Sequence, residues 1–203
     1  MHRIETKKGQ SMAKENIKAK EGFTIIEVVL VLAIAGLIFL MVFIALPALQ
    51  RSQRDTQRRD DMARFISQLA QYQTNNNRRV PGSATANALT DWQKTLTNGK
   101  YTDGFIGNYL NAGGDTFDDP NGSPYQVGSV CVLSNDTTCN TTGSTSGAKK
   151  PNQALTWDAD KNKIYVYKNA KCDGENAKFV KDSPNQIAIR YKLEGAGVYC
   201  GNN

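Results

Sequence analysis

The sequence contains almost no histidine: among 203 residues there is one, His2. It lies in a hydrophilic N-terminal stretch, and a chain processed beyond that stretch would contain none. Without histidine there is no His-based catalytic triad and no His-liganded metal site. The sequence also lacks a Gly-rich phosphate loop and a nucleophile motif. We therefore predict that the protein is not an enzyme and that it uses no cofactor.

Charge is absent from Val28 to Leu49, a run of 22 mostly apolar residues. As an α-helix this run would extend roughly 33 Å at about 1.5 Å per residue, which is enough to cross a bilayer. A secretory signal peptide has a shorter apolar region of about 7–15 residues, followed by a small-residue cleavage site. Here the small residue, Gly22, precedes the run. We predict a retained transmembrane helix over residues 23–50, kinked at Pro47 because the ring removes a backbone donor.

Cysteine is absent until Cys131, and the four cysteines are Cys131, Cys139, Cys172 and Cys200. Their spacing is not that of a zinc site. An even number of cysteines behind a membrane segment favours disulfides formed in an oxidising compartment. Four cysteines allow three pairings. We favour Cys131–Cys139 with Cys172–Cys200, because each pair brackets one candidate loop or strand unit; buried free thiols are the alternative.

Positive charge is concentrated at the N-terminus. Residues 1–22 carry six Lys and Arg against three Asp and Glu, a net +3 out of the total of +6. They form a basic, hydrophilic leader without apolar periodicity. Basic residues on the two sides of the apolar run number six and five, so the positive-inside rule does not decide the orientation. The cysteines do: they place the C-terminal domain outside the cytoplasm.

The helix is expected to continue beyond the membrane through residues 51–75. Its first part, "QRSQRDTQRRDD", is polar on every face and contains the favourable acid-first pair Asp55–Arg59. An apolar stripe at helical spacing then follows, made of Met62, Phe65, Ile66, Leu69 and Tyr72. A single helix is therefore predicted from about Thr24 to about Thr74, ended by "NNNRRVPGS".

Residues 76–203 are long enough for a globular head domain with a modest core. A short helix is predicted over Thr85–Leu96, ending before Gly99, and a loop over Tyr101–Gly128. Strands are predicted at Val127–Leu133, Ala154–Trp157, Lys163–Tyr167 and Gln186–Leu193, with "DADKN" as a hairpin turn. These strands favour an antiparallel meander whose apolar face covers the helical stripe. The expected fold is α+β: a long N-terminal helix packed on a disulfide-stabilised antiparallel sheet.

The junction "GFTIIE" combines four features in order: a basic leader, Gly22–Phe23, a glutamate at Glu27, and an apolar run. This pattern strongly resembles the N-terminus of type IV prepilins, the family of pilins and their secretion-system relatives. The resemblance covers Lys20 to about Asn75. Gly36 also matches a position where the family commonly has glycine. One departure is clear: the helix-kinking proline of the family would fall at Ile44, and here it is Pro47.

The resemblance implies cleavage after Gly22 by a prepilin peptidase, N-methylation of the new amine on Phe23, and assembly into a filament. Glu27 has no Lys or Arg near it in the membrane run, so the freed amine of Phe23, its own or a neighbour's, is the cation expected to pair with it. The implied partners are the peptidase and methyltransferase, a pilus assembly platform, the membrane, and further copies of the chain in a helical homopolymer. The implied location is the cell membrane, then an extracellular pilus, with surface or DNA ligands possible.

Weaker signals lie in the head domain. Asp115, Asp118 and Asp119 could supply oxygen ligands to a metal, but a plain capped turn is favoured and no metal site is predicted. "NGS", "NDT" and "NTT" match the glycosylation sequon. Lysines in the ranges 149–150 and 161–181 could attract DNA, although interleaved aspartates favour an ordinary mixed surface.

Three functional classes remain open from the sequence. The first is a structural subunit of a type IV pilus used in adhesion, twitching motility or DNA uptake. The second is a pseudopilin of a type II secretion-like system, which would share every N-terminal feature. The third is a membrane-tethered enzyme or solute-binding domain. Against it stand the absence of histidine beyond the leader, of a Gly-rich phosphate loop and of a nucleophile motif.

Overall fold

The computed structural model describes residues 22–82, 88–140, 144–195 and 197–203. The chain divides into two compact units, Met1–Ala45 and Leu46–Asn203. The predicted leader, residues 1–22, lies outside the described part except for Gly22. Each unit is described by itself below.

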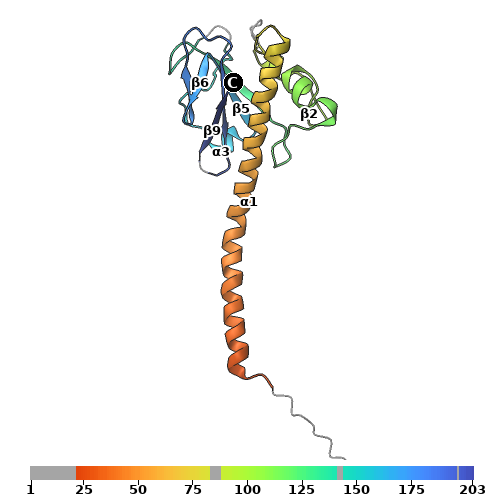
Figure 1. Ribbon diagram of the computed structural model, residues 1–203, viewed down its shortest axis with the longest axis vertical. Helices are drawn as coiled ribbons and strands as arrows, with labels where there is room; N and C mark the ends of the chain where they lie inside the picture. Colours follow the sequence, from red (N-terminus) through yellow and green to blue (C-terminus); the bar gives the residue numbers. More distant parts are fainter. Residues whose placement is uncertain (1–21, 83–87, 141–143, 196) are drawn as a thin grey trace, which may run out of the picture. The chain divides into compact units, whose positions relative to one another are not determined.

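The longest element is helix α1, Ile25–Asn75, a single helix of 51 residues (Figure 1). It confirms the helix predicted from about Thr24 to about Thr74. The chain leaves it through two residues with positive φ, Asn77 at 52° and Arg78 at 61°. These left-handed residues reverse the chain direction, so "NNNRRVPGS" ends the helix as predicted.

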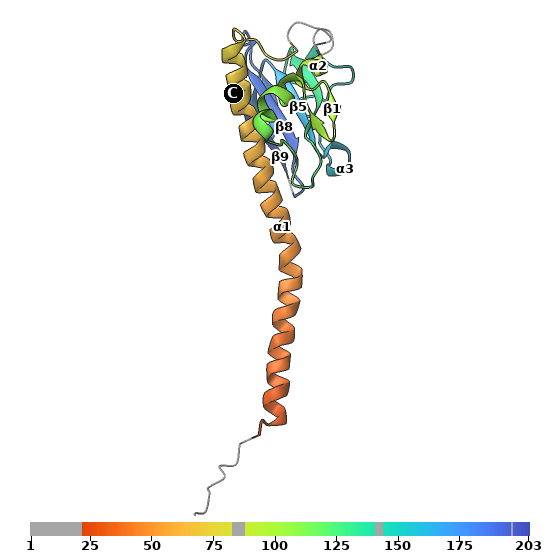
Figure 2. The same ribbon diagram turned by 90° about the vertical axis from the view of Figure 1, so that its right-hand side faces the viewer.

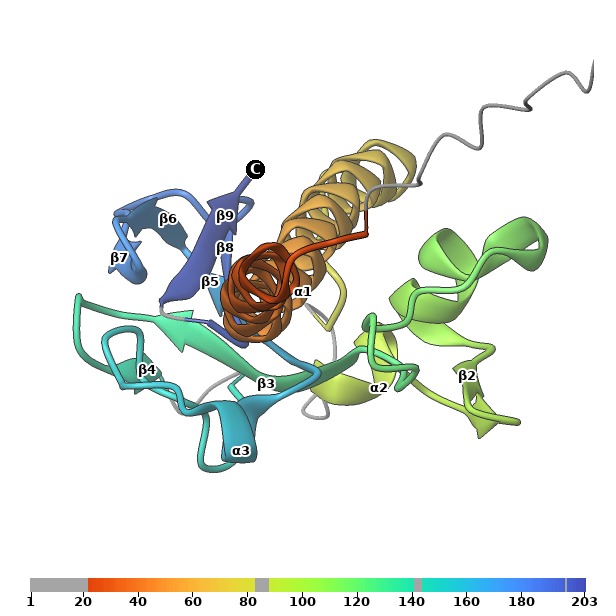
Figure 3. The ribbon, with the colours of Figure 1, turned by 90° about the horizontal axis from the view of Figure 1, so that it is seen from below.

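A five-stranded sheet forms the centre of the second unit, with strand order β4-β3-β5-β8-β9 (Figure 3). Its strands are β3 (Gln126–Leu133), β4 (Cys139–Asn140), β5 (Lys163–Lys168), β8 (Ile187–Lys192) and β9 (Val198–Asn202). Three of the four neighbouring pairs are antiparallel, and β3 and β5 are parallel. With helix α1 and two disulfides, this confirms the α+β fold with a mainly antiparallel sheet.

The simple meander was wrong at one point, the parallel pair β3–β5. A parallel pair needs a connection of about a dozen residues or more to return the chain to the same end of the sheet. Residues 134–162 provide that connection. The sequence pattern identified β3 and β5 as strands but could not tell whether such a long connection crosses over.

The predicted strand Ala154–Trp157 and the hairpin turn at "DADKN" were also wrong. In their place lies the short helix α3, Trp157–Asp160. The backbone N–H of Thr156 donates to the Asp160 carboxylate at 2.8 Å, which closes this turn of helix. A local hydrogen bond of this kind competes with the extended conformation that Leu155, Thr156 and Trp157 would otherwise favour.

The predicted helix Thr85–Leu96 is shorter in the structure: α2 covers Ala88–Trp92, and residues 85–87 lie outside the described part. Leu96 belongs instead to a small hairpin of β1 (Leu96–Thr97) and β2 (Lys100–Tyr101). Asn98 and Gly99 both have positive φ, as a two-residue hairpin turn requires. Gly99 therefore marks this hairpin rather than the end of a helix.

Several elements were not predicted. The loop expected over Tyr101–Gly128 contains a π-helical turn, η1 (Ile106–Leu110), and a 3-10 turn, η2 (Ala112–Gly114). A second hairpin, β6 (Ala170–Asp173) and β7 (Asn176–Phe179), and the edge strand β9 were also missed. These segments are short or rich in charged and glycine residues, so no apolar alternation marks them.

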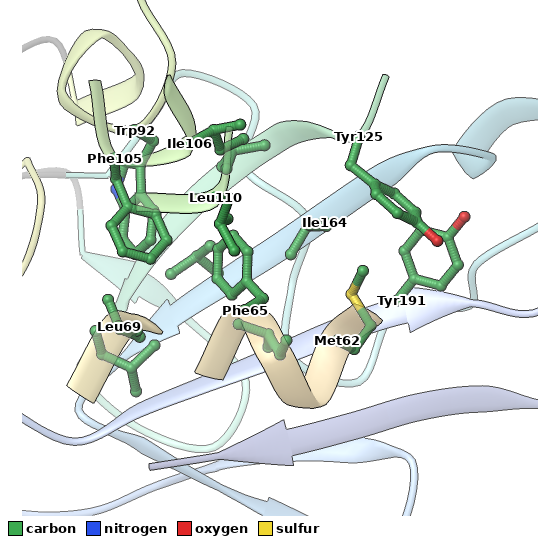
Figure 4. Packing of buried hydrophobic residues seen from close by; sticks show 14 of the residues in the cluster. Met62, Phe65, Leu69, Trp92, Phe105, Ile106, Leu110, Tyr125, Ile164 and Tyr191 are labelled. Carbon is green, nitrogen blue, oxygen red and sulfur yellow. The ribbon is translucent and has the colours of Figure 1, made fainter. Parts of the chain in front are cut away.

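The predicted packing of the helical stripe on the sheet is confirmed (Figure 2). Met62, Phe65 and Leu69 of α1 are buried, and the close view in Figure 4 shows them facing β5 and β8. The apolar face predicted for the last strand lies in the same cluster, namely Ile187, Ile189, Tyr191 and Leu193. The opposite face of the sheet packs on the β6–β7 hairpin, with Tyr165, Tyr167 and Ala188 in a second cluster.

Candidate functional site

The N-terminal motif begins α1 with a reciprocal pair of hydrogen bonds. Glu27 Oε2 accepts from the backbone N–H of Thr24 and from its hydroxyl, both at 2.8 Å. The N–H of Glu27 in turn donates to Thr24 Oγ1 at 3.4 Å. This is a capping box, in which the first and fourth residues of a Thr-x-x-Glu motif satisfy each other's orphan N–H groups. Glu27 therefore stabilises the helix start in the single chain.

Thr24 is the residue of this motif that the sequence analysis missed. The signal was present, since a Thr three residues before a Glu and ahead of an apolar run is a typical capping box. The other carboxylate oxygen, Glu27 Oε1, makes no hydrogen bond to any residue that the structure describes. Oε2 thus caps the N-terminus of the helix, and Oε1 can accept a hydrogen bond from a further partner.

Gly22 and Phe23 precede α1 in non-helical conformation, and Phe23 is 89% exposed. A Cβ placed on Gly22 would find no atom within 4 Å, and the same holds for Gly36 in the apolar run. Packing against the residues that the structure describes therefore requires glycine at neither position.

The first unit has a continuous apolar surface that is exposed. Among its described residues none is buried, and large side chains from Ile25 to Phe43 are exposed on every side of α1. A surface of this extent needs lipid or other protein to cover it. This one helix is long and apolar enough to cross a membrane.

Pro47 lies inside α1 in the second unit. Since proline has no N–H, the carbonyl of Phe43 loses its intrahelical donor there. The helix is assigned without a break through this position. The kink expected at Pro47 stays a prediction.

The second unit is organised around a buried arginine. Arg58 of α1 is fully buried, and its guanidinium makes a two-pronged contact with Asp119, with N–O distances of 2.7 and 3.0 Å. It also donates to Asp55 at 2.8 Å and to Glu194 at 3.1 Å. The ring of Trp157 lies 4.6 Å from its central carbon. We refer to Arg54, Asp55, Arg58, Asp119 and Glu194 as the helix–head ion network.

Electrostatics in this network favour the charged forms of Arg58 and Glu194. Burial opposes the charge on Arg58, but hydrogen bonds to Asp119 and Asp55 outweigh it and raise the pKa of Arg58 above its usual value. The hydrogen bond from Arg54, at 2.6 Å, lowers the pKa of Glu194 to about 2. The predicted pair Asp55–Arg59 does not form. Asp55 pairs instead with Arg58, one residue earlier, and accepts hydrogen bonds from two backbone N–H groups of the β8–β9 turn.

The acidic candidates for a metal site are engaged elsewhere. Asp119 binds Arg58 and accepts the hydroxyl of Tyr191 at 2.8 Å, while Asp115 pairs with Arg64 at 2.9 Å. Asp118 forms a backbone bridge to Pro124. The described residues contain no group of three potential metal ligands. The loop is the capped turn that the sequence favoured, with the N–H of Asn121 bonded to Asp119.

The loop also contacts α1 through Tyr125, which is fully buried and donates to Asp61 at 2.9 Å. Burial raises the pKa of Tyr125 and the pKa of Asp61, the latter despite this hydrogen bond. The Tyr125 ring meets Tyr191 edge-on, with 5.5 Å between centroids. This loop, which lies far from α1 in sequence, is therefore fixed on the helix beside the ion network.

The two disulfides pair Cys131 with Cys139 and Cys172 with Cys200, as predicted. The first closes the β3–β4 hairpin, and the second links β6 to the edge strand β9. The oxidising compartment expected for the head domain stays a prediction.

The lysines proposed to attract DNA lie among acidic partners. Lys149 approaches Asp160 at 3.3 Å, and Lys178 approaches Asp173 at 3.7 Å. These contacts favour the ordinary mixed surface that the sequence already suggested. DNA binding stays a prediction.

Comparisons with protein-family models, with curated proteins and with solved structures found no match for this chain. Function therefore has to be argued from the motif at the start of α1, the exposed apolar helix and the disulfide-bonded head.

Proposed function

We propose that this chain is the precursor of a type IV pilin, cleaved after Gly22 and assembled into a surface filament through the first half of α1. The observation that carries the proposal is Gly22–Phe23 with Glu27 four residues later, placed directly ahead of a charge-free helix whose apolar surface is uncovered. Each part of this arrangement has a role in the proposed sequence of events.

Cleavage comes first. The Gly22–Phe23 junction is exposed and lies outside the helix, so a membrane peptidase can reach the amide bond in an extended form. Hydrolysis adds water across that bond, leaving a carboxylate on Gly22 and a free α-amine on Phe23. Glycine at the scissile position lets the protease approach the backbone closely. Methylation of the amine keeps its positive charge.

Assembly then uses the new amine. A carboxylate held inside the bilayer costs about 2.5–3.5 kcal/mol on insertion scales and therefore seeks a partner. Glu27 Oε2 is held by Thr24, whereas Oε1 has no hydrogen bond to a described residue and can accept one from the Phe23 amine of an adjoining copy. The exposed apolar helices of adjoining copies would cover one another in the filament core, as they are covered by lipid before assembly.

The proposal is tested in the producing cells with four variants of the full chain. Gly22→Leu should block cleavage and leave the precursor with its leader, seen by mass spectrometry. Glu27→Gln should be cleaved but should lose filaments in sheared-surface preparations. Gln still supports a capping box, so this variant removes the charge and keeps the cap. Thr24→Val, which removes the capping hydroxyl and keeps the charge, and its control Thr24→Ser should retain filaments.

Some outcomes would contradict the proposal. If the Glu27→Gln variant forms filaments at the wild-type level and only Thr24→Val loses them, the role of Glu27 is to cap the helix and not to pair with an amine. Subunits that do not begin at a methylated Phe23 would rule out the processing step. Correct processing without surface filaments containing this chain would favour the pseudopilin alternative. A chain whose length does not depend on the prepilin peptidase would favour a membrane-tethered binding domain.

A further inference from the structure

Three Asn-x-Ser/Thr sequons occur in the head domain. They differ in the hydrogen bonds that the side-chain amide of the asparagine makes. They begin at Asn121, Asn135 and Asn140. The hydroxyl residue of the third, Thr142, lies outside the described residues. The first two can be compared directly.

The Asn121 side chain is engaged on both sides. Its Nδ2 donates to Asn162 Oδ1 at 3.1 Å, and its Oδ1 accepts from the N–H of Ser123 at 2.9 Å. The same turn is held by Asp119, which the buried Arg58 binds. Glycosylation would have to break the Nδ2 contact and open a fixed loop.

Asn135, at the exposed tip of the β3–β4 hairpin, has the same backbone contact at Oδ1 but differs from Asn121 at Nδ2. Its Oδ1 accepts from both the N–H and the hydroxyl of Thr137, at 2.9 and 3.0 Å. Asn135 is exposed, and its Nδ2 makes no hydrogen bond to any described residue. The two donors stabilise negative charge on the amide oxygen, which makes the Nδ2 protons more acidic. The sequon hydroxyl and the acceptor amide are already brought together.

The tip is held in this shape by the body of the head. The Cys131–Cys139 disulfide closes its base. The Oδ1 of Asp136, at the surface, accepts from the N–H of Phe179 at 2.9 Å and ties the tip to β7. Asn135, Asp136 and Thr137 are all exposed.

We propose that Asn135 is a site of N-linked glycosylation. Asn135 Nδ2 attacks the anomeric carbon of a lipid-pyrophosphate-linked oligosaccharide and forms the N–C bond. The C–O bond to the pyrophosphate breaks, the lipid pyrophosphate leaves with the bonding pair, and Nδ2 gives up one proton to a base of the transferase. The inference requires the head to lie in the compartment where its disulfides form; it does not require that the chain forms a filament.

The test uses the full chain in detergent with both disulfides intact. It is incubated with a lipid-pyrophosphate-linked oligosaccharide and a single-subunit oligosaccharyltransferase whose acceptor rule is Asn-x-Ser/Thr alone. Peptide mass spectrometry should find the glycan on Asn135. The signal should be lost in Asn135→Gln and in Thr137→Val, and retained in the matched control Asn121→Gln. Reduced, denatured chain shows that the enzyme is active, because all sequons are open there.

Two results would overturn the proposal. One is a folded chain that stays unmodified at Asn135, or is modified equally at Asn121, while the denatured chain is glycosylated. The other is an Asn135 peptide without glycan in chain isolated from the producing cells. Neither result bears on cleavage after Gly22, so failure here is distinguishable from failure of the filament proposal.

Discussion

Glu194, in the turn between β8 and β9, accepts hydrogen bonds from two arginines of α1. Arg54 donates at 2.6 and 2.8 Å and Arg58 at 3.1 Å. The Arg54 hydrogen bond lowers the pKa of Glu194 from 4.5 to about 2. Because the folded-state pKa is depressed, the charged form stabilises the folded head above pH 4.5, and this contribution is lost as the pH falls toward about 2.

The Glu194→Gln variant should therefore be less stable than wild type at neutral pH and should approach it in acid. The expected result is a flatter dependence of the unfolding free energy on pH between 4.5 and about 2. The unfolding free energy is measured by urea titration of the full chain in detergent at several pH values, followed by near-UV circular dichroism. Asp158→Asn, an exposed carboxylate without an ion pair among the described residues, should keep the wild-type slope. Equal slopes for Glu194→Gln and wild type would contradict the assignment.

At the scale of elements, Arg58 joins α1 to three segments that are distant in sequence. Arg58 contacts Asp119 in the capped turn, Glu194 in the β8–β9 turn and the ring of Trp157 at the start of α3. Buried ion pairs add little net stability over apolar packing, but removal of one partner leaves an uncompensated buried charge. The network therefore specifies where α1 meets these segments more than how tightly it binds them.

Arg58→Ala should lower the free energy of unfolding of the head by about 3–5 kcal/mol, since Asp119 would remain buried without its cation. Arg59→Ala, at the next and exposed position, should change it by at most about 0.5 kcal/mol. Urea unfolding of the full chain in detergent measures both variants. A loss below about 1 kcal/mol for Arg58→Ala would show that Asp119 finds another partner or becomes hydrated.

Only the local elements with a clear period were predictable, namely α1 and the strands β3, β5 and β8. The start of α1 depends on Thr24 and Glu27, which are three residues apart. The buried face of β8 depends on the alternation of apolar residues within that one strand. Both signals are contained in a few neighbouring residues. Helix α3 was missed because one local hydrogen bond outweighs a weak strand preference. It runs from the backbone N–H of Thr156 to the side-chain carboxylate of Asp160.

At the scale of the whole molecule, all four cysteines are paired and lie in the head domain. Disulfides persist in oxidising compartments and are rare in the cytosol. An orientation with the head outside the cytoplasm therefore predicts that the pairs exist in the membrane-bound chain before any assembly.

Cells should be quenched with acid and the denatured chain treated with a maleimide mass tag, then analysed by gel. Without reductant no tag should attach, and after reduction four should. The control Cys172→Ser frees Cys200 and should take one tag without reductant, which shows that the reagent reaches a lone thiol. Four tags without reductant on the wild-type chain would place the head in the cytoplasm.

The sequence by itself determined the features that depend on neighbouring residues. These are the charge-free helix, its capped start after Phe23, the amphipathic stripe at Met62 to Tyr72, and the strands with clear alternation. Each follows from the 3.6- or 2-residue period of side chains along one element.

Only the tertiary structure decided which distant residues meet. Arg58 and Asp119 are 61 residues apart, β3 and β5 pair in parallel across a long connection, and Asn121 is engaged while Asn135 is open. Arg58 lies four residues before Met62, on the helical stripe, and Arg59 lies off it. The sequence therefore distinguishes the two arginines, but it does not tell which carboxylates Arg58 meets. The difference arises because α1 packs with one face on the sheet, so that one arginine is buried among carboxylates and the next lies in water.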